Sequence, residues 1–481
     1  MAAEPTPFFS AAPGAGGDRL LLVGYHFPPD PAVGALRWQK FADLIAERGW
    51  GLDVLTQHPA TLAARDDARL ADLPPGVRVY GVTPRSLLVE RAEHALWRWY
   101  RAVRPATPTQ PDSADTGRSA GAPRKVSILR SAIRWLPREP RDLVRAYFGW
   151  MDFARSGAWA GRAAEAGIAL TRGRRPLAAI SSGPPHFATH EAARRIARRT
   201  GAPFVMDLRD PWSRMTDLPE GMASPVWWHL AERHEARAVA SAALVVTNTG
   251  QHLAALQRLY PAQRDRMMTV FNGYDEEPLP RARRGRRFMI AYAGSIYMTR
   301  DPRPLLRAVA RVVADRGLTV DDIGVDFMGH VQEFEGRSVQ SIAAEEGVAD
   351  FVRVFPPRPR RDALQFQADA HVLVSLPQDS TLTIPAKIFE YARFPAWVLA
   401  LGGPESASAS LVRELGGDAV SYGDADGIAE VLSRRYAQHA AGEAPRPLAA
   451  DAPLYSRRAQ GQRLLDAIAS LTDRARRDRP R

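Results

Sequence analysis

The feature that most constrains the fold is an alternation of short apolar strands and amphipathic helices, which runs twice along the chain. The first strand is predicted over 19–25, where a continuous apolar run is typical of a strand buried on both faces of a parallel sheet. A helix follows from Gly34 to about Arg48, and its apolar residues share one face. The other strands of this first series are predicted over 51–57, 77–82, 177–182, 203–207, 242–248 and 267–271.

A charged, proline-bearing linker over 278–287 separates the two series. Strands of the second series are predicted over 288–293, 325–328, 352–355, 372–376, 397–401 and 419–422. We therefore predict an α/β protein with two doubly wound domains in tandem, whose ligands bind beyond the carboxyl ends of the strands. The predicted parts are a disordered tail over 1–18, an N-terminal domain over 19–278, a C-terminal domain over 286–450, and a segment over 451–481 whose helix packs back on the N-terminal domain.

Composition limits the classes of function. The 481 residues include no cysteine, which excludes disulfides, thiol catalysis and cysteine-ligated metals. No apolar run approaches the about 18 residues that span a bilayer, and the start of the chain lacks the pattern of a signal peptide. The net charge of +12, mostly from arginine, suits anionic lipid, nucleic acid or phosphorylated substrates. Nucleic acid ranks last among these partners, and we expect none, because no sheet motif combines aromatic and basic residues.

A basic helical insert at about 85–170 interrupts the first series. Its part over 85–150 mixes arginines with aromatic residues, namely Trp97, Trp99, Tyr100, Trp135, Tyr147, Phe148 and Trp150. Such a surface suits an anionic membrane, so we expect a cytoplasmic protein that docks on the inner face of the cytoplasmic membrane. The alternative is that these helices only cover the N-terminal sheet.

Two loops that follow the first strand of each series offer backbone donors for a phosphate. The loop Phe27–Arg37 carries Gly34 at a helix start, and the turn Tyr292–Arg300 carries Gly294 with Arg300 just beyond it. A tight structural turn with a solvated arginine is the alternative for the second loop. Because G-x-G-x-x-G is absent, a dinucleotide fold is disfavoured.

The segment Thr381–Tyr391 predicts a threonine-flanked turn before a helix that opens with Pro385. It places Lys387 and Glu390 on one face of the first turn, where a cation suits a diphosphate and a carboxylate suits sugar hydroxyls. An ordinary amphipathic helix start is the alternative.

Two further motifs follow strands of the first series. The loop Ser181–His190 presents His186 after a stiff Gly-Pro-Pro turn and places His190 one helical turn later. Both histidines could instead be buried structural residues, and a metal role is disfavoured because no acidic third ligand has the expected spacing. In the second motif, Asp207, Arg209 and Asp210 form either part of an acceptor site or a structural ion-pair cluster.

Together, in their order and spacing, these motifs resemble the retaining glycosyltransferases of family 4, which have the two-Rossmann GT-B fold. The likeness is closest to bacterial polysaccharide-assembly members, and it runs from about Arg19 to Arg474 except for the insert. The motifs are Phe-Pro-Pro…Gly, Ser-Gly-Pro-Pro-His, Asp-Leu-Arg-Asp-Pro-Trp, Asn-Gly-Tyr-Asp at 272–275, Ala-Gly-Ser and Ile-Pro-Ala-Lys-Ile-Phe-Glu-Tyr.

The resemblance implies a nucleotide-sugar donor, UDP-, GDP- or dTDP-linked, and a glycan or lipid-linked acceptor. Arg300 takes the place of the family's phosphate-neutralising lysine, and Ser295 stands where many members have arginine, so that Lys387 supplies the second cation. Glu390 matches the glutamate that holds the ribose. The donor-side residues are therefore Gly34, Gly294, Ser295, Thr383 and Glu390, and the catalytic residues are His186, Arg300 and Lys387. His190 joins Asp207, Arg209 and Asp210 on the acceptor side.

The first glutamate of the family's paired motif would fall at Leu382 and is absent. A non-catalytic scaffold therefore stays open as an alternative. A nucleotide-sugar epimerase of the same fold is the other alternative, although it would need acid and base carboxylates in the cleft, which the sequence does not place. No cofactor and no metal are expected, because Arg300, Lys387 and two helix N-termini suit the charge of the leaving diphosphate. The Asp424-Ala-Asp426 pair is predicted to cap a helix rather than to bind a metal.

Overall fold

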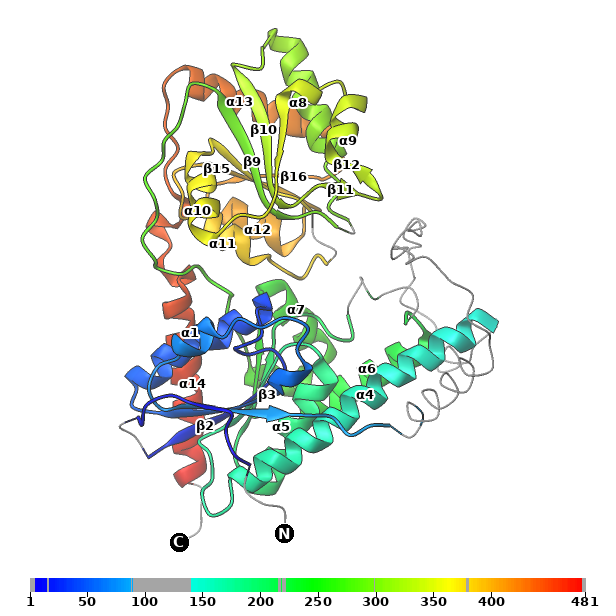
Figure 1. The fold of residues 1–481 in the computed structure, drawn as a ribbon, viewed down its shortest axis with the longest axis vertical. Coiled ribbons are helices and arrows are strands. Elements are labelled where there is room, and N and C mark those ends of the chain that lie inside the picture. Colours follow the sequence, from blue (N-terminus) through cyan, green and yellow to red (C-terminus); the bar gives the residue numbers. More distant parts are fainter. Residues whose placement is uncertain are drawn as a thin grey trace, which may run out of the picture.

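The computed structural model describes residues 5–14, 17–87, 89, 140–214, 218, 222–297, 299–377 and 380–477. Two α/β domains lie one above the other in Figure 1, and the chain crosses between them twice. The first crossing is the irregular segment that precedes β9, and the second leads into α14. The prediction of two doubly wound α/β domains is confirmed.

The N-terminal sheet has eight strands in the order β1-β4-β3-β2-β5-β6-β7-β8. Their bounds are β1 Phe9–Ser10, β2 Arg19–Gly24, β3 Gly51–Gln57, β4 Val77–Val82, β5 Ala179–Ser182, β6 Phe204–Leu208, β7 Leu244–Thr247 and β8 Met267–Thr269. All pairs are parallel except β1 with β4. The strand order reverses between β2 and β5, which is where a doubly wound sheet binds its ligands.

Helices cover both faces of this sheet. They are α1 Leu36–Glu47, α2 Ala68–Ala71, α4 Pro140–Leu170, α5 His186–Thr200, α6 Pro225–Ser241 and α7 Gly250–Leu259. Strand β2 shows why its run is apolar throughout: Leu20 and Leu22 face one layer, with α1 and α14. Leu21 and Val23 face the other layer, with α4, α5 and α6. A strand buried on both faces needs apolar residues at every position.

The C-terminal sheet has six strands, all parallel, in the order β13-β10-β9-β14-β15-β16. The strands are β9 Phe288–Ser295, β10 Ile323–His330, β13 Val352–Phe355, β14 Val372–Ser375, β15 Trp397–Leu401 and β16 Asp418–Val420, and a separate hairpin joins β11 Glu333–Phe334 to β12 Arg337–Ser338. The helices are α8 Arg303–Arg316, α9 Val339–Glu345, α10 Arg360–Asp369, α11 Ala386–Tyr391, α12 Ala407–Glu414 and α13 Ala425–Ala440. Its switch point lies between β9 and β14.

The last helix, α14 Arg457–Arg477, lies along α1 of the N-terminal domain (Figure 1). Leu464, Leu465 and Ile468 are fully buried in the same apolar cluster as β2 and α1. Just before the helix, the returning chain runs beside the first crossing. Tyr274 and Ser456 form an isolated parallel bridge there, so the two crossings are hydrogen-bonded to each other.

The tail over 1–18 is not disordered throughout, which corrects one prediction. Phe9–Ser10 form β1 and pair with Val79 and Arg78 of β4. Phe8 and Phe9 also pack on the apolar cluster of the domain. Strand β4 would otherwise be an open sheet edge, and pairing satisfies its backbone groups.

Most of the predicted insert, 88 and 90–139, lies outside the described residues. The helix that follows, α4, is one 31-residue element, and its second half belongs to the domain core. Phe153 and Trp159 are buried in one apolar cluster with residues of α5 and α6, and Met151 is buried as well.

Candidate functional site

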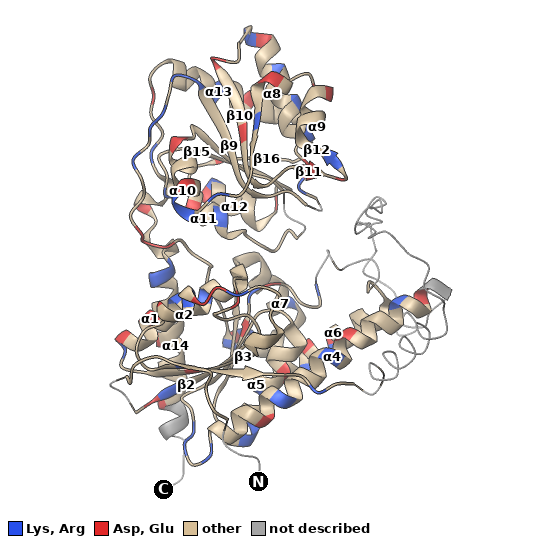
Figure 2. Cartoon of the chain, in the orientation of Figure 1, with Lys and Arg blue, Asp and Glu red and all other residues tan. Residues whose placement is uncertain are grey.

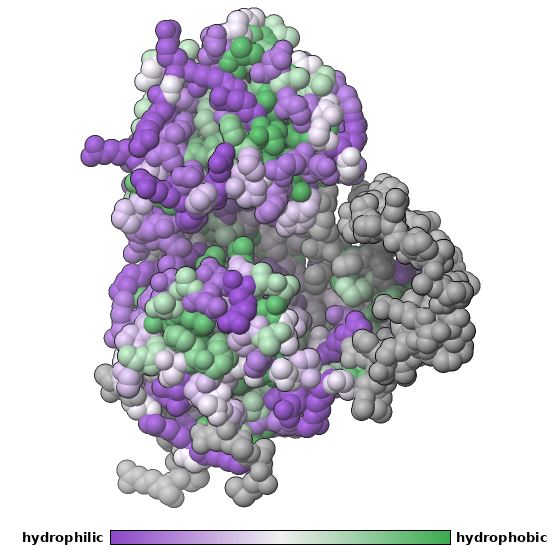
Figure 3. Space-filling view, viewed as in Figure 1, coloured by the Kyte–Doolittle hydropathy of each residue, from purple (hydrophilic) through white to green (hydrophobic). Residues whose placement is uncertain are grey.

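A cleft of about 480 Å³ lies between the two domains, within the usual range of small-molecule sites. The surface in Figure 3 is hollowed between the domains on this side. Both domains contribute to its lining, which includes Gly34, Arg37, Pro184, His186, Arg209, Asp210, Asn272, Tyr297, Arg300, Ser380, Thr383, Pro385 and Arg457. Apart from Asn272 and Arg457, these residues follow β2, β5 and β6 in one domain and β9 and β14 in the other, so both switch points open into one space.

The position of Arg209 explains why residue 34, at the cleft, and residue 183, next to Pro184 in the chain, are both glycines. Its Nη1 donates to the Gly34 carbonyl oxygen. A Cβ at Gly34 would lie 2.9 Å from Nη2 of Arg209, and one at Gly183 would lie 2.6 Å from the same atom. Gly183 also has a φ of 62°, in the region that favours glycine. Gly34 and Gly183 therefore allow the close approach of the Arg209 guanidinium. This guanidinium is the cation that lies at the cleft, beside the start of α1.

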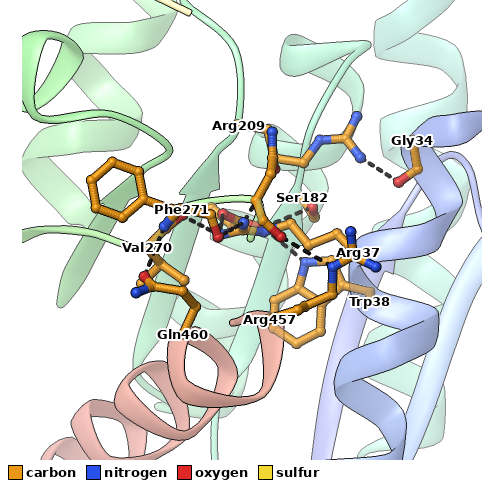
Figure 4. Close-up of polar contacts among 11 residues, drawn as sticks. Gly34, Arg37, Trp38, Ser182, Arg209, Val270, Phe271, Arg457 and Gln460 are labelled. Atoms are coloured by element: carbon orange, nitrogen blue, oxygen red, sulfur yellow. Dashed lines mark hydrogen bonds and ion pairs between the residues drawn. The ribbon is translucent and has the colours of Figure 1, made fainter. Parts of the chain in front are cut away.

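Asp207 does not line the cleft. Its carboxylate is fully buried and receives hydrogen bonds from Arg37, Trp38 and Ser182 (Figure 4). The Arg37 guanidinium also donates to the carbonyl oxygens of Val270 and Phe271. The alternative of a structural ion-pair cluster therefore describes Asp207, which joins β6 to β5 and α1, whereas Arg209 and Asp210 border the cleft.

His186 and His190 belong to a buried hydrogen-bonded chain at the start of α5. His186 Nδ1 lies 3.3 Å from His190 Nε2, and His190 Nδ1 lies 2.7 Å from the Ser181 hydroxyl. Burial lowers the pKa of His190 to about 3 and holds the pKa of His186 well below its usual range. Both rings are therefore neutral at pH 7. Only His186 lines the cleft, so His190 lies behind it rather than at the cleft surface.

Cations gather where β9 ends in the C-terminal domain. Lys387 Nζ is buried, lies 4.0 Å over the Tyr292 ring, and has no hydrogen-bond partner in the described part of the chain. Burial, with the nearby charge of Arg300, lowers its pKa to about 7. A Cβ at Gly294 would lie 2.3 Å from this Nζ, so Gly294 makes room for the lysine.

Arg300 borders the same region and faces the cleft. Its guanidinium lies 4.0 Å over the Tyr297 ring and donates to the Ser295 carbonyl oxygen at 3.1 Å. Ser295 is thus held through its backbone, which also accepts from the Tyr292 hydroxyl at 2.7 Å. Arg300 and Lys387 thus place two cations close to this turn.

Glu390 lies outside the cleft lining in this arrangement of the domains. Its carboxylate forms an ion pair with Arg360 of α10 at 2.6 Å, and Arg360 also pairs with Glu277 of the first crossing. Thr383 does line the cleft. The position of the missing glutamate, Leu382, has a backbone role instead: its carbonyl oxygen accepts from Thr249 Oγ1 at 2.6 Å, across the two domains.

The sequence did not single out Arg37, Arg457 and Tyr297 as lining residues of the cleft. Arg457 begins α14 and donates to the Asn272 carbonyl oxygen and to Asp275. Arg457 lies at the cleft because the second crossing brings the chain back there, and no local sequence motif reveals this path. In Figure 2, Lys and Arg positions lie on α11 and at the start of α14, where the two domains face each other.

Two features bear on metals and membranes. Among the described residues, no group of three His, Asp or Glu side chains could hold a metal ion. Asp424 caps α13 by accepting from the Gly427 N–H at 2.9 Å, as predicted. Within the same part of the chain, no helix has the length and apolar character needed to cross a bilayer.

Comparisons with known proteins agree on the fold. No protein-family model matches the chain. A curated relative, the D-inositol 3-phosphate glycosyltransferase 1 of Catenulispora acidiphila, is 27% identical over 239 residues, which are 46% of this chain and 56% of the relative. The chain thus spans about half the length of the curated relatives it matches.

Solved structures match over nearly the whole chain. Sucrose-phosphate synthase from Thermosynechococcus elongatus has a TM-score of 0.58 and 13% identity, with 95% of this chain and 100% of that chain covered. The Anabaena protein HepE, solved in complex with UDP-glucose, has a TM-score of 0.52 and 12% identity, with 94% and 99% covered. The protein therefore has the GT-B fold, with two Rossmann-like domains that face a cleft.

Proposed function

We propose that the protein is a glycosyltransferase that moves a sugar from a nucleotide-sugar donor to a hydroxyl acceptor. The observation that carries the proposal is the meeting of both switch points in one cleft, with Arg209, Arg300 and Arg457 at its walls and Lys387 beside it. Cations and helix N-termini in a partly dry cleft suit a diphosphate. The named relatives, all glycosyltransferases, and the UDP-glucose held by HepE support this choice of ligand.

The chemistry needs charge stabilisation more than acid or base groups. A bond forms between the acceptor oxygen and the anomeric carbon, and the bond from that carbon to the phosphate oxygen breaks. The electron pair leaves with the nucleoside diphosphate, which can also take the acceptor's proton. Arg300 and Lys387 stabilise the developing negative charge, and the reaction requires no metal. The family resemblance favours retention of configuration at the anomeric carbon.

His186 is assigned to the transferred sugar. It begins α5 at the end of β5, and its neutral ring can donate or accept one hydrogen bond in the cleft. A ring that stays neutral holds a sugar hydroxyl without adding a charge near the reacting carbon. The acceptor is a glycan or lipid-linked glycan of cell-surface polysaccharide or glycoconjugate synthesis.

The decisive experiment is a donor screen with purified protein. UDP-, GDP- and dTDP-sugars are incubated with and without acceptor extracts, and the released nucleoside diphosphate is detected by mass. We expect release from one donor group, unchanged by EDTA. A scaffold would release nothing, an epimerase would convert the donor without releasing diphosphate, and activity that EDTA abolishes and magnesium restores would contradict the metal-free mechanism.

We also propose that the region 85–150 docks the enzyme on an anionic membrane. Within its described part, the first half of α4 exposes Leu143, Val144, Phe148 and Trp150. Interfacial aromatic residues beside arginines bind such surfaces, at about 1 kcal/mol for each basic residue. Liposome flotation tests this: binding to phosphatidylglycerol vesicles should fall with salt, whereas equal recovery with neutral vesicles would leave only a role in covering the sheet.

A further inference from the structure

A second cavity lies on the N-terminal domain next to the cleft. It has a volume of about 440 Å³ and is lined by Tyr25, Pro84, Arg85, Ser86, Leu87, Asp152, Arg155, Ser156, Ala158, Trp159 and Pro185. Pro185 borders this side cavity, whereas the adjacent residues Pro184 and His186 border the cleft. One turn of chain therefore separates the two spaces.

Helix α4 builds one wall of the side cavity with a single face. Asp152, Arg155, Ser156 and Trp159 follow the spacing i, i+3, i+4, i+7, so their side chains lie above one another. Trp159 is buried, donates to the Val82 carbonyl oxygen, and contacts the Tyr25 ring edge-on with centroids 5.1 Å apart. The rings of Trp159 and Tyr25, together with the strand ends, form a rigid floor of the cavity.

Three hydroxyl groups border this cavity. Within the described part of the chain, the hydroxyls of Tyr25, Ser86 and Ser156 form no hydrogen bond, although Ser156 lies in a helix where a serine often bonds back to the preceding turn. The Asp152 carboxylate accepts from Trp227 Nε1 at 3.2 Å through one oxygen. The cavity thus offers several donors and acceptors, of the kind that hold a ring with many hydroxyl groups.

The charges at this cavity are balanced. Arg85 forms a two-pronged ion pair with Glu165, both contacts being 3.1 Å. Arg155 interacts electrostatically with Asp152, whose pKa is raised by burial. A phosphate would need cations that are not already neutralised, as in the cleft, whereas an uncharged polyol ring needs only hydrogen bonds.

We propose that the side cavity is a subsite for an uncharged sugar or cyclitol ring of the acceptor, beyond the group that reacts in the cleft. The role of this subsite in sugar transfer rests on the proposed function. Binding of the ring does not, because it can be measured by itself. Asp152 and Ser156 recognise the hydroxyls, and the Pro184–Pro185 turn directs the rest of the acceptor towards His186. The acceptor is therefore larger than the single hydroxyl group that is glycosylated.

The test uses the full chain and two defined probes, methyl α-D-glucopyranoside and myo-inositol. Saturation-transfer NMR at millimolar probe concentration measures their binding to the wild type, Ser156→Tyr, Asp152→Asn and the control Ser241→Tyr. The control makes the same exchange at an exposed position of another helix. Calorimetry with UDP measures donor-site binding in the same proteins.

At least one probe should bind the wild type and Ser241→Tyr, fail to bind Ser156→Tyr because the ring of tyrosine fills the cavity, and bind Asp152→Asn at least about tenfold more weakly. UDP affinity should be equal in all four proteins. Equal binding of the probe to all variants, or no binding to the wild type, overturns the subsite. No UDP binding in any of the four proteins, with probe binding intact, would instead count against a uridine nucleotide as the donor and leave the subsite standing.

Discussion

The Arg37 guanidinium and the Asp207 carboxylate form a buried ion pair, with Nε–Oδ2 and Nη2–Oδ1 both at 3.2 Å. The side chain of Arg37 is 4% exposed and that of Asp207 is 0% exposed. The pair also fixes the chain at Val270 and Phe271, where the first crossing to the other domain begins (Figure 4). Asp207, which the sequence analysis placed on the acceptor side, is therefore part of the framework that holds the cleft.

We predict that Asp207→Asn destabilises the N-terminal domain by about 3–5 kcal/mol, because it leaves the buried arginine without a counter-charge. Denaturant unfolding followed by tryptophan fluorescence measures this. The control is Asp426→Asn, which breaks an exposed pair with Arg311 and should leave the unfolding midpoint unchanged. A stable Asp207→Asn protein that has lost only turnover would return Asp207 to the acceptor site.

Lys387 provides a prediction about pH. Its pKa is about 7 in the unbound protein, and a bound diphosphate should raise it, because the ammonium then gains a counter-charge. Binding therefore takes up a proton above pH 7, so UDP affinity should fall by up to about tenfold per pH unit between pH 7 and 9. The terminal phosphate of the diphosphate is mostly ionised in this window, because its last pKa is about 6.

Calorimetry in two buffers with different ionisation enthalpies measures the proton uptake directly. Lys387→Met should bind UDP more weakly at pH 7 and show no uptake. The unbound wild type should also gain stability relative to Lys387→Met as pH rises from about 7 to 10.5, because the unfolded lysine binds more protons there. A pH-independent affinity in the wild type would contradict a role for this lysine at the phosphates.

Buried histidines make the fold sensitive to acid. His252 of α7 is 1% exposed, its two ring nitrogens have no partner among the described residues, and burial lowers its pKa to about 4. A depressed histidine pKa contributes stability that is present above pH 6.5 and is lost as pH falls towards 4. Each pH unit in this window costs up to about 1.4 kcal/mol for one such group.

His252→Leu should therefore flatten the fall in unfolding free energy between pH 6.5 and 4, while remaining folded at pH 7. Urea titrations at several pH values measure the slope. Its control, Gln251→Leu, introduces leucine on the same helix without removing a titratable group, so its slope should be that of the wild type. An unchanged slope in His252→Leu would mean that His252 does not titrate in the folded state at these pH values.

His186 should matter for turnover more than for folding. In His186→Ala, His190 and Thr189 still hold the start of α5 in place. The Thr189 hydroxyl donates to the Gly183 carbonyl oxygen at 2.9 Å. We expect a melting temperature within a few degrees of the wild type and at least a hundredfold loss of donor turnover, the scale of a positioned polar group at a reacting centre. Normal activity in the folded fraction would favour a structural role.

Local patterns predicted the sheets well because a doubly buried strand admits few sequences. The run Arg19–Gly24 has only apolar residues in its interior, and the run Trp397–Leu401 is buried at every position. The strand β1 escaped prediction because its two residues carry no periodicity, and only the open edge of β4 and two phenylalanines fix it there.

The site was predictable where a loop follows a strand, since parallel strands bring their carboxyl ends to one edge. Gly34, His186 and Arg300 were found in this way, and all three border the cleft. What a side chain pairs with was not predictable, because partners such as Arg37 and Asp207 come from segments 170 residues apart. The place of Arg457 at the cleft was not predictable for the same reason, because only the second crossing of the chain brings this residue there.

Glu390 and its partner Arg360 give the last prediction. If Glu390 holds the ribose of the donor, Glu390→Gln should weaken donor binding at least about tenfold, the scale of a lost hydrogen bond to a charged group. Arg360 competes for the same carboxylate, at 2.6 Å, and its other partner is Glu277 of the first crossing. Arg360→Gln should therefore leave donor affinity unchanged or strengthen it.

Calorimetry with UDP and with the donor found in the screen measures both variants, and far-ultraviolet circular dichroism checks that α10 and α11 keep their helical content. The opposite signs separate the two roles of the pair. If Arg360→Gln weakens donor binding as much as Glu390→Gln does, the ion pair serves to hold α11 in place, and the ribose must be bound by other groups of the C-terminal domain.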